Sequence, residues 1–179
     1  KYTIGEAVAR NGNGQALPPD AASDDAADAY QQLQDALRRS KRAAEEETRS
    51  LNPRAHIEPI VGLLDHAGKV FVCGLGDDGL FAREFAMRLS LLGLLTVHHA
   101  DPILMMANLS AARPGDVLLM FSEYGKLPEL SQVSRQFQAC EGKVISITRH
   151  TANPLRAHAD AALVISAHDP APHVEQLLY

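Results

Sequence analysis

The sequence predicts an α/β protein: a three-layer α-β-α sandwich around a mainly parallel sheet of about five strands, preceded by a long N-terminal helix. Two observations lead to this fold class. Short runs of aliphatic and β-branched residues alternate with helical segments, as they do in parallel sheets that helices cover on both faces. Apolar residues also make up 46% of the 179-residue chain, which is enough to bury one core of this kind.

The N-terminal part is predicted to be a tether followed by two helices. Residues 1–22 contain the turn-forming stretches NGNG and LPPD, which are typical of a linker. A helix is expected from Ser23 to about Leu51, because this stretch lacks Gly and Pro and opens with capping residues. A shorter helix follows over residues 55–67. The long helix carries a narrow apolar stripe, suited to packing on a neighbour or a second chain, made of Ala26, Tyr30, Leu33, Leu37 and Ala44.

The remaining residues are predicted to alternate regularly between strands and helices. Strands are expected over residues 69–73, 94–98, 117–122, 143–148 and 161–166. Helices are expected over residues 80–92, 102–112, 127–140 and 154–158. Within the first of these helices, the spacing of Phe81, Phe85 and Leu89 places the three side chains on one face.

Charge and composition limit the function classes. A net charge of −5 and a pI near 5.9 provide no basic surface for a nucleic-acid backbone. Cys73 and Cys140 are the only cysteines, which fits reduced thiols better than a disulfide framework. No apolar run approaches the roughly 20 residues that cross a bilayer, and the start is not a secretion signal. We therefore expect a cytoplasmic protein without membrane contact, and, since the chain starts without Met and ends in VEQLLY, a piece of a longer one.

Two loops are candidates for ligand binding, because open α/β sheets bind ligands at the carboxyl ends of their strands. The first, GLGDDG over residues 74–79, has glycines that allow a tight turn and expose N–H groups at a helix N-terminus. The second, SEYGKLPE over residues 122–129, again joins a strand to a helix. The first loop also matches the G-x-G-x-x-G spacing of dinucleotide-binding proteins, with Asp101 as a ribose partner, but a lone motif of this kind is weak evidence.

The order of elements resembles the sugar isomerase (SIS) domain over about residues 56–166. The resemblance rests on G-x-G after the first strand, on ARPGDVLLMFSEYG, and on KVISITRHTANPLRAHADAALVI. With the long preceding helix, the chain is similar to the effector domain of the RpiR family of bacterial transcriptional regulators. This implies a non-enzymatic domain over residues 23–179 that senses a sugar, a polyol or a sugar-derived metabolite. It also implies a homodimer or homotetramer, no cofactor and no metal, and DNA binding only through a helix-turn-helix domain absent from this chain. The alternative is a SIS-type sugar-phosphate isomerase, in which Glu129 is the only strand-end carboxylate with a claim to catalysis.

The resemblance also implies which residues bind the ligand: Gly74, Gly76, Asp78, Ser122, Tyr124, Gly125, Leu127 and Glu129. The family's first loop reads G-x-G-x-S, and this chain has Asp78 in place of the serine. The second loop reads S-x-S-G-x-T-x-E, and here Tyr124 replaces the second serine and Leu127 the threonine. Three of the four hydroxyls that would donate to a phosphate are therefore missing.

Asp78 is the most consequential of these departures. Two anions about 4 Å apart repel by roughly 4 kcal/mol at an effective dielectric constant of about 20. Either Lys126, Arg83 or a cation neutralises Asp78, or the ligand carries no phosphate at this point. The alternative is that an aspartate caps the following helix. We expect this role for Asp77, while for Asp78 a cap and a ligand acceptor remain equally open.

The remaining polar residues at a strand end are His98, His99 and Asp101. Adjacent residues on a strand point to opposite faces, so the two histidines are not expected to chelate one metal ion. One histidine should be partly buried and the other exposed. The family resemblance implies that His99 or Asp101 contacts the ligand.

Overall fold

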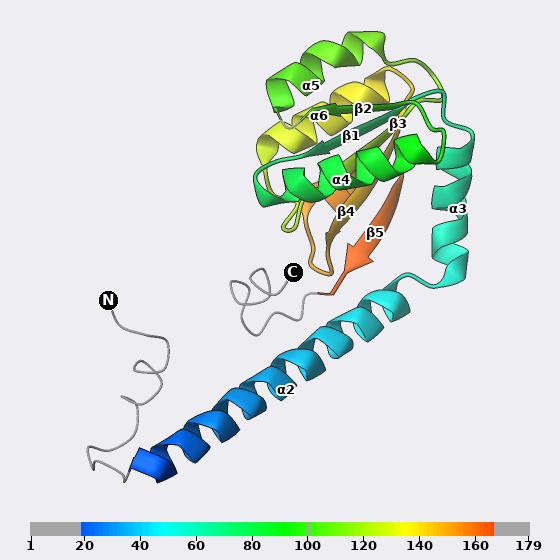
Figure 1. Ribbon diagram of the computed structural model, residues 1–179. Coiled ribbons are helices and arrows are strands. Elements are labelled where there is room, and N and C mark those ends of the chain that lie inside the picture. Colours follow the sequence, from blue (N-terminus) through cyan, green and yellow to red (C-terminus); the bar gives the residue numbers. More distant parts are fainter. Residues whose placement is uncertain (1–18, 100, 167–179) are drawn as a thin grey trace. The chain divides into compact units, whose positions relative to one another are not determined.

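The computed structural model describes residues 19–99 and 101–166, without the side chains of residues 19–27 and 102 (Figure 1). Most of the predicted tether, the side chain of Ala26 and the C-terminal VEQLLY run therefore lie outside the described residues. The chain divides into two units: residues 1–43 together with 168–179, and residues 44–167. In the first unit the described residues are helical, and the second contains the sheet.

Every predicted element within the described residues is present. The helices are α2 (Pro19–Leu51), α3 (Arg54–Asp65), α4 (Asp77–Leu91), α5 (Pro102–Asn108), the 3₁₀ turn η1 (Leu109–Ala111), α6 (Pro128–Ala139) and α7 (Pro154–His158). The strands are β1 (Val70–Gly74), β2 (Thr96–His99), β3 (Val117–Phe121), β4 (Lys143–Arg149) and β5 (Ala161–Ile165). The long helix begins at Pro19 and not at Ser23, because proline is well accommodated at the first helical position, where an N–H would have no partner.

The sheet confirms the predicted parallel architecture. Its five strands lie in the order β2-β1-β3-β4-β5, and all four neighbouring pairs are parallel. From β1 the chain moves outward to β2 and then returns past β1 to form β3. The strand order therefore reverses between β1 and β3, and such a switch point is where open α/β sheets bind ligands.

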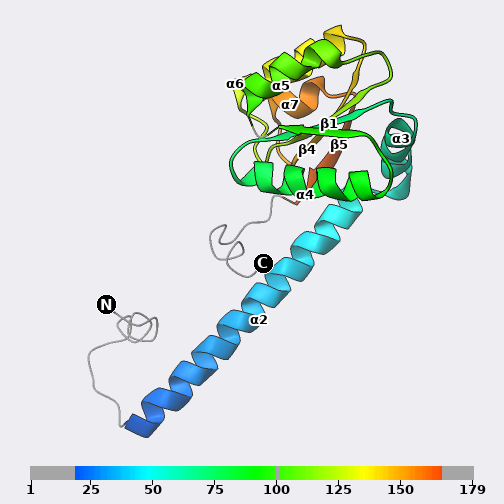
Figure 2. The same cartoon turned by 45° about the horizontal axis from the view of Figure 1, so that its top comes forward.

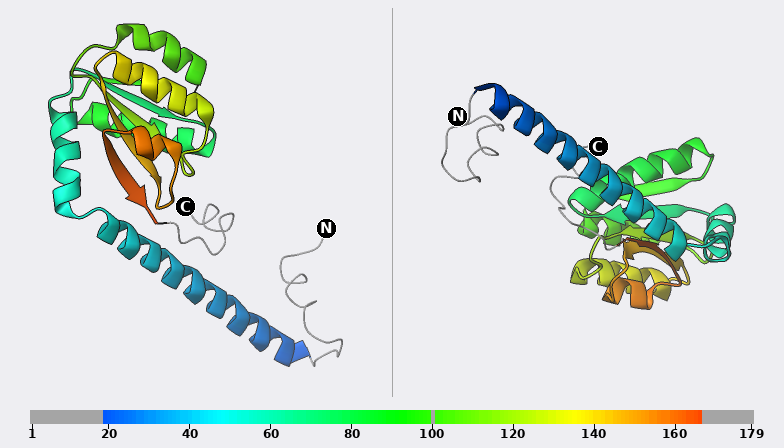
Figure 3. Two further views of the ribbon diagram at one scale, coloured as in Figure 1. Left: turned by 180° about the vertical axis from the view of Figure 1, so that it is seen from behind. Right: turned by 90° about the horizontal axis from the view of Figure 1, so that it is seen from below.

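Helices cover both faces of the sheet, which gives the three predicted layers. Figure 2 shows α4 on one side of the sheet and α5, α6 and α7 on the other. The view from behind in Figure 3 shows α7, in orange, on the same side as α6, in yellow, with which it is in contact. Alternate residues of the strands point to the two sides. Val70, Val72 and Leu119 pack towards α4, and Phe71, Leu118 and Met120 pack towards α6.

The buried face of α4 is formed mainly by small side chains. Ala82, Ala86 and Leu89 are buried, whereas Phe81 is 60% exposed. Of the three residues predicted to share a face, Leu89 is buried and Phe85 packs against Phe121, whereas Phe81 lies mostly in solvent. The physical reason is the close approach of α4 to β1, since this approach leaves room for alanine side chains but not for a phenylalanine.

The free edge of β5 is covered by residues at the end of α2. The side chain of Asn52 accepts a hydrogen bond from Val164 N at 2.9 Å and donates one to Val164 O at 2.6 Å. Ser166 N donates to Thr48 Oγ1 at 3.0 Å. These contacts satisfy backbone groups that an edge strand would otherwise expose.

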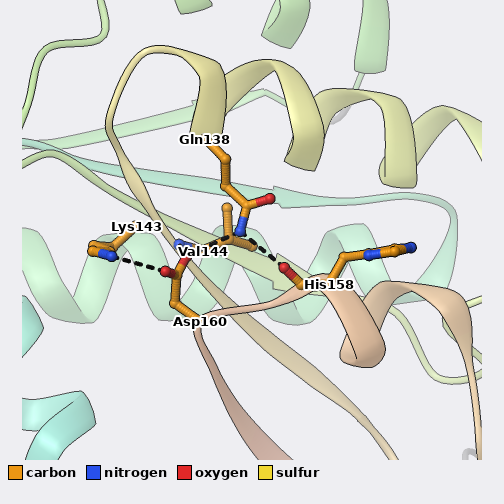
Figure 4. A network of polar contacts seen from close by, with 5 residues as sticks. All are labelled: Gln138, Lys143, Val144, His158 and Asp160. Carbon is orange, nitrogen blue, oxygen red and sulfur yellow. Dashed lines mark hydrogen bonds and ion pairs between the residues drawn. The ribbon is translucent and has the colours of Figure 1, made fainter.

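A second polar cluster ties the beginnings of β4 and β5 together (Figure 4). Asp160 accepts hydrogen bonds from Lys143 Nζ at 2.9 Å, from Val144 N at 2.9 Å and from Gln138 Nε2 at 3.1 Å. Gln138 Nε2 also donates to His158 O at 2.8 Å. Although burial raises the pKa of Asp160, these hydrogen bonds outweigh it and hold the pKa below its usual value.

Candidate ligand-binding site at the carboxyl ends of the strands

The first predicted loop lies at the switch point and places a helix N-terminus close to β1. Gly76 is the N-cap of α4 and has φ +58°, a conformation that residues with side chains rarely adopt. A Cβ on Gly74 would lie 2.6 Å from the carbonyl oxygen of Asp78, so only glycine allows α4 to begin this close to the strand. The glycines of this loop thus have a local structural reason whether or not a ligand binds.

Neither aspartate of this loop caps the helix through its side chain. The N-cap is Gly76, and Asp77 and Asp78 are the first two residues of α4. The predicted capping role of Asp77 is therefore wrong, because the turn ends one residue earlier than the sequence suggested. In the first turn both carboxylates still interact favourably with the helix dipole.

Asp78 instead joins the two loops. Its Oδ2 accepts a hydrogen bond from the backbone N–H of Glu123, 45 residues away in the second loop, at 3.0 Å. The structure excludes the capping role for Asp78, and its role as a ligand acceptor stays a prediction. Among the described residues, neither Lys126 nor Arg83 forms an ion pair with Asp78, so of the two alternatives the neutralisation by these side chains is not observed.

The surroundings of Asp78 oppose its ionisation. Burial raises the pKa of its carboxyl group, the hydrogen bond from Glu123 lowers it, and the neighbouring charge of Asp77 raises it further. The net result is a pKa above the usual value, because one backbone N–H does not make up for lost hydration and a like charge.

The second loop is held by its own hydrogen bonds. Ser122 is 3% exposed, and its Oγ accepts a hydrogen bond from Gly125 N at 3.1 Å. Gly125 has φ +60°, and a Cβ there would lie 2.2 Å from Oδ1 of Asn153. The carbonyl of Gly125 also accepts a hydrogen bond from Leu155 N at 3.2 Å. Ser122 and Gly125 therefore fix the shape of this loop, and Asn153, which also caps α7, limits its space.

Arg149 completes this corner, and it was not among the predicted site residues. It lies at the end of β4 and pairs with Glu123, with 2.6 Å between Nη2 and Oε1. Its guanidinium also lies over the ring of Tyr124, 5.3 Å from the ring centre. Tyr124 therefore supports an arginine where the family pattern has a hydroxyl. The rule that pointed to the ends of β1 and β3 would have found Arg149 if applied to β4.

Leu127 and Glu129 lie at the far end of the second loop. Leu127 is the N-cap of α6, is 43% exposed and makes no side-chain cap. Glu129 is exposed in the first turn of α6, where a negative charge interacts favourably with the helix dipole. Neither residue is hydrogen-bonded to Asp78 or to the N–H of Glu123, and their place in the ligand site stays a prediction.

The polar residues at the end of β2 are His98 and His99, followed by Asp101, and the predicted ligand contact of His99 or Asp101 stays a prediction. The sheet register pairs His98 with Val72 and His99 with Cys73, so the two histidines face opposite sides of the sheet. Both are half-buried, so the predicted contrast in their exposure is wrong. Burial is the main cause of a lowered pKa for His98. Asp101 caps α5, accepting from Ile103 N at 2.7 Å and from Leu104 N at 3.1 Å.

Metal ligands and reactive thiols do not stand out in this corner. Within residues 19–99 and 101–166, no three His, Cys, Asp or Glu side chains gather in a way that could hold a metal ion. Cys73 is fully buried at the end of β1, and burial raises the pKa of its thiol to about 11. A thiol in this state is a poor nucleophile.

Among the residues that the structure describes, no helix is long and apolar enough to span a membrane.

Comparison with known proteins establishes the family. The family model of the SIS domain matches residues 63–176. The chain belongs to the SIS domain family. The resemblance deduced from the sequence is thus confirmed. In this SIS domain the strand order is 2-1-3-4-5, the first loop is rich in glycine and the second loop is polar.

Relatives and similar structures include both regulators and enzymes. The HTH-type transcriptional regulator YfhH of Escherichia coli is 30% identical over 124 residues, which cover 69% of this chain and 44% of YfhH. The bifunctional protein Glk of Burkholderia thailandensis is 29% identical over 60% of this chain and 17% of its own length. The chain thus spans less than half the length of either relative.

Three solved structures show the same fold at lower identity. NanR of Vibrio vulnificus in complex with ManNAc-6P has a TM-score of 0.71, 22% identity, and coverage of 87% of this chain and 60% of NanR. The sugar isomerase domain of an RpiR transcription factor from Sphaerobacter thermophilus has a TM-score of 0.70 and 20% identity, and the match covers 75% of this chain and 76% of that domain. A phosphoheptose isomerase from Francisella tularensis has a TM-score of 0.66 and 19% identity, and the match covers 78% of this chain and 86% of the isomerase.

Proposed function

We propose that this chain is the ligand-sensing and dimerising domain of an RpiR-like transcriptional regulator of carbohydrate or related metabolism, with an altered phosphosugar site. The observation that carries the proposal is the hydrogen bond between Asp78 and Glu123 N, since it places a carboxylate at the junction of the two loops. The likeness to YfhH supports a regulator. DNA binding would come from a helix-turn-helix domain outside these residues, and the effector would be a sugar, a polyol or a sugar-derived metabolite.

The loss of hydroxyl groups from the two loops favours sensing over catalysis. Asp78, Tyr124 and Leu127 stand where the family pattern has hydroxyl groups, so a phosphorylated substrate would lose most of its donors. Isomerisation also requires a base and an acid placed around a firmly held substrate. A sensor needs only a difference in ligand affinity between two conformations of the regulator.

A thermal-shift screen tests the proposal. Sugar phosphates, free sugars, polyols and amino compounds would each be added to the purified chain. A ligand present at 100 times its Kd stabilises the native state by about 2.7 kcal/mol, which raises the Tm by several degrees. We expect such a shift with an unphosphorylated compound. A strong shift with sugar phosphates that Ser122→Ala abolishes would contradict the proposal.

An isomerase remains the alternative, and Glu129 is the observation in its favour. Its carboxylate is exposed next to the second loop, in a fold shared with a phosphoheptose isomerase. Incubating the chain with aldose and ketose phosphates would detect turnover by chromatography. Turnover that Glu129→Gln removes, and that the control Glu141→Gln leaves unchanged, would replace the regulator proposal with the enzyme.

Self-association is part of the proposal and rests on α2. Tyr30 and Leu33 are 63% and 55% exposed on its apolar stripe. We expect a homodimer or homotetramer in size-exclusion chromatography with light scattering. Leu33→Glu should shift it towards monomer, whereas Gln32→Glu, one residue away on another face of the helix, should not. A monomer before any substitution would contradict this part.

A further inference from the structure

The acceptor at the junction of the two loops is provided by the protein itself. Asp78 projects from the first turn of α4, and its Oδ2 lies 3.0 Å from the backbone nitrogen of Glu123. A helix N-terminus facing backbone N–H groups is the arrangement that binds phosphate in many proteins. Here a carboxylate covalently attached to the chain occupies one of those donors.

Other backbone donors of the second loop are occupied as well. Ser122 N donates to the carbonyl of Ile147 at 3.1 Å, as an extension of the sheet. Gly125 N donates to Ser122 Oγ at 3.1 Å. Together with the Glu123 N–H, three N–H groups that follow β3 thus have acceptors within the protein. A phosphate that used any of these three N–H groups would have to displace its acceptor.

We propose that the Asp78 carboxylate is a built-in anion, which takes the place of a ligand's phosphate between the two loops and thereby sets the specificity of the site against anions. The proposal rests on the function proposed above, because it assumes that these loops form the effector site. It goes further by assigning specificity to one residue and by predicting that a single substitution restores phosphate binding.

Nearby charges strengthen the exclusion of anions. Asp77 is exposed and adjacent, and its charge disfavours a second negative charge at Asp78 and equally at an incoming ligand. Arg149, which contacts the second loop, already pairs with Glu123 and lies over the ring of Tyr124. An anionic ligand would thus meet two aspartates, an arginine whose charge is partly neutralised, and the exposed Lys126 of the second loop.

The test compares Asp78→Ser with Asp77→Asn. Asp78→Ser removes the carboxylate and introduces the hydroxyl donor of the family pattern, whereas Asp77→Asn removes the same charge one residue away and leaves the bridge intact. Binding of ManNAc-6P, of N-acetylmannosamine and of inorganic phosphate would be measured by calorimetry. We expect Asp78→Ser to bind ManNAc-6P at least about tenfold more tightly than the unsubstituted chain, a smaller gain for Asp77→Asn, and less than twofold change in the affinity of any of these proteins for N-acetylmannosamine.

Several outcomes would overturn the proposal. The first is an unsubstituted chain that binds ManNAc-6P as tightly as Asp78→Ser does. An equal gain with Asp77→Asn would also overturn it, because the effect would then be one of overall charge. Asp78→Asn provides the control for folding, since its amide oxygen can still accept from Glu123 N. If this variant unfolds with the same cooperativity as Asp78→Ser and neither gains phosphate affinity, the proposal is wrong.

The outcomes for the two proposals can be told apart. If no variant binds a phosphorylated compound but the thermal-shift screen finds a neutral ligand, the sensor function stands and the role of Asp78 does not. If the chain turns over a sugar phosphate, the sensor function fails. A tenfold gain for Asp78→Ser would then still support the role of Asp78 in specificity.

Discussion

Two carboxylates tie distant segments together at opposite ends of the sheet, and their environments differ. Asp160, before β5, accepts three hydrogen bonds, one of them from a lysine, and its pKa is lowered. Asp78, after β1, accepts one from a backbone N–H, lies beside another aspartate, and its pKa is raised. The first environment stabilises the charged form of the carboxylate and the second opposes it.

This difference separates a structural contact from a candidate functional one. Asp160 lies at the ends of the strands opposite to the predicted ligand loops, and its partners satisfy it fully. Asp78 lies at the switch point, where ionisable groups with unfavourable environments are typical of binding and catalytic sites. The comparison can be tested by changing each carboxylate in turn.

The largest effect is expected from Asp160→Ala. The substitution leaves Val144 N and Gln138 Nε2 without their acceptor, which should lower the free energy of unfolding by about 2 kcal/mol. Urea denaturation of both proteins measures this loss. Lys143→Met is the control, because Lys143 is 53% exposed and its ion pair is worth about 0.5 kcal/mol. Equal losses for both variants would show that the ion pair dominates the cluster.

The dependence of stability on pH should have opposite signs at the two sites. A lowered pKa means that Asp160 contributes stability above its ordinary value of 3.8 and loses it as the pH falls. A raised pKa means that the stability contributed by Asp78 is present below 3.8 and is lost as the pH rises. Between pH 3 and pH 7, Asp160→Asn should therefore become more destabilising and Asp78→Asn less so. Thermal unfolding of both variants at several pH values measures the two slopes, and slopes of the same sign would contradict the comparison.

A smaller loss is expected from Asp78→Ala, about 1 kcal/mol or less. The substitution removes the acceptor of Glu123 N, but it also removes a partly buried charge that faces Asp77. Hydrogen exchange should be faster at the amide of Glu123 and unchanged at the amide of Val144. A loss as large as that of Asp160→Ala would mean that the bridge is mainly structural.

The smallest effect is expected from Tyr124→Ala. Tyr124 is 50% exposed, and a cation–π contact at an exposed site is worth about 0.5–1 kcal/mol. Urea denaturation should show a loss of this size, with Leu127→Ala, at 43% exposure, as the control. A loss above about 2 kcal/mol would show that Tyr124 holds Arg149 and Glu123 in place and is therefore central to the site.

Much of the fold followed from local patterns in the sequence. Runs such as VFVCG and VLLMF are apolar at every position, which indicates strands buried on both faces, and each is followed by a turn and a helix. The carboxyl-end rule then placed both loops correctly at one end of the sheet. The same patterns did not show which side chains of α4 are buried, because the spacing of Phe81 and Phe85 carries no information about how closely Gly74 lets the helix approach.

The sequence by itself determined that this chain is a parallel α/β domain whose two strand-end loops carry an aspartate and lack three of the four hydroxyls in the family pattern. Only the tertiary structure decided what Asp78 does, because its partner is 45 residues away and becomes a neighbour through the placement of β3 beside β1. Arg149 and Glu123 are also distant in the sequence, and only the fold brings them together as an ion pair. Propensity and periodicity act over a few residues, whereas contacts between loops depend on the order in which the strands assemble.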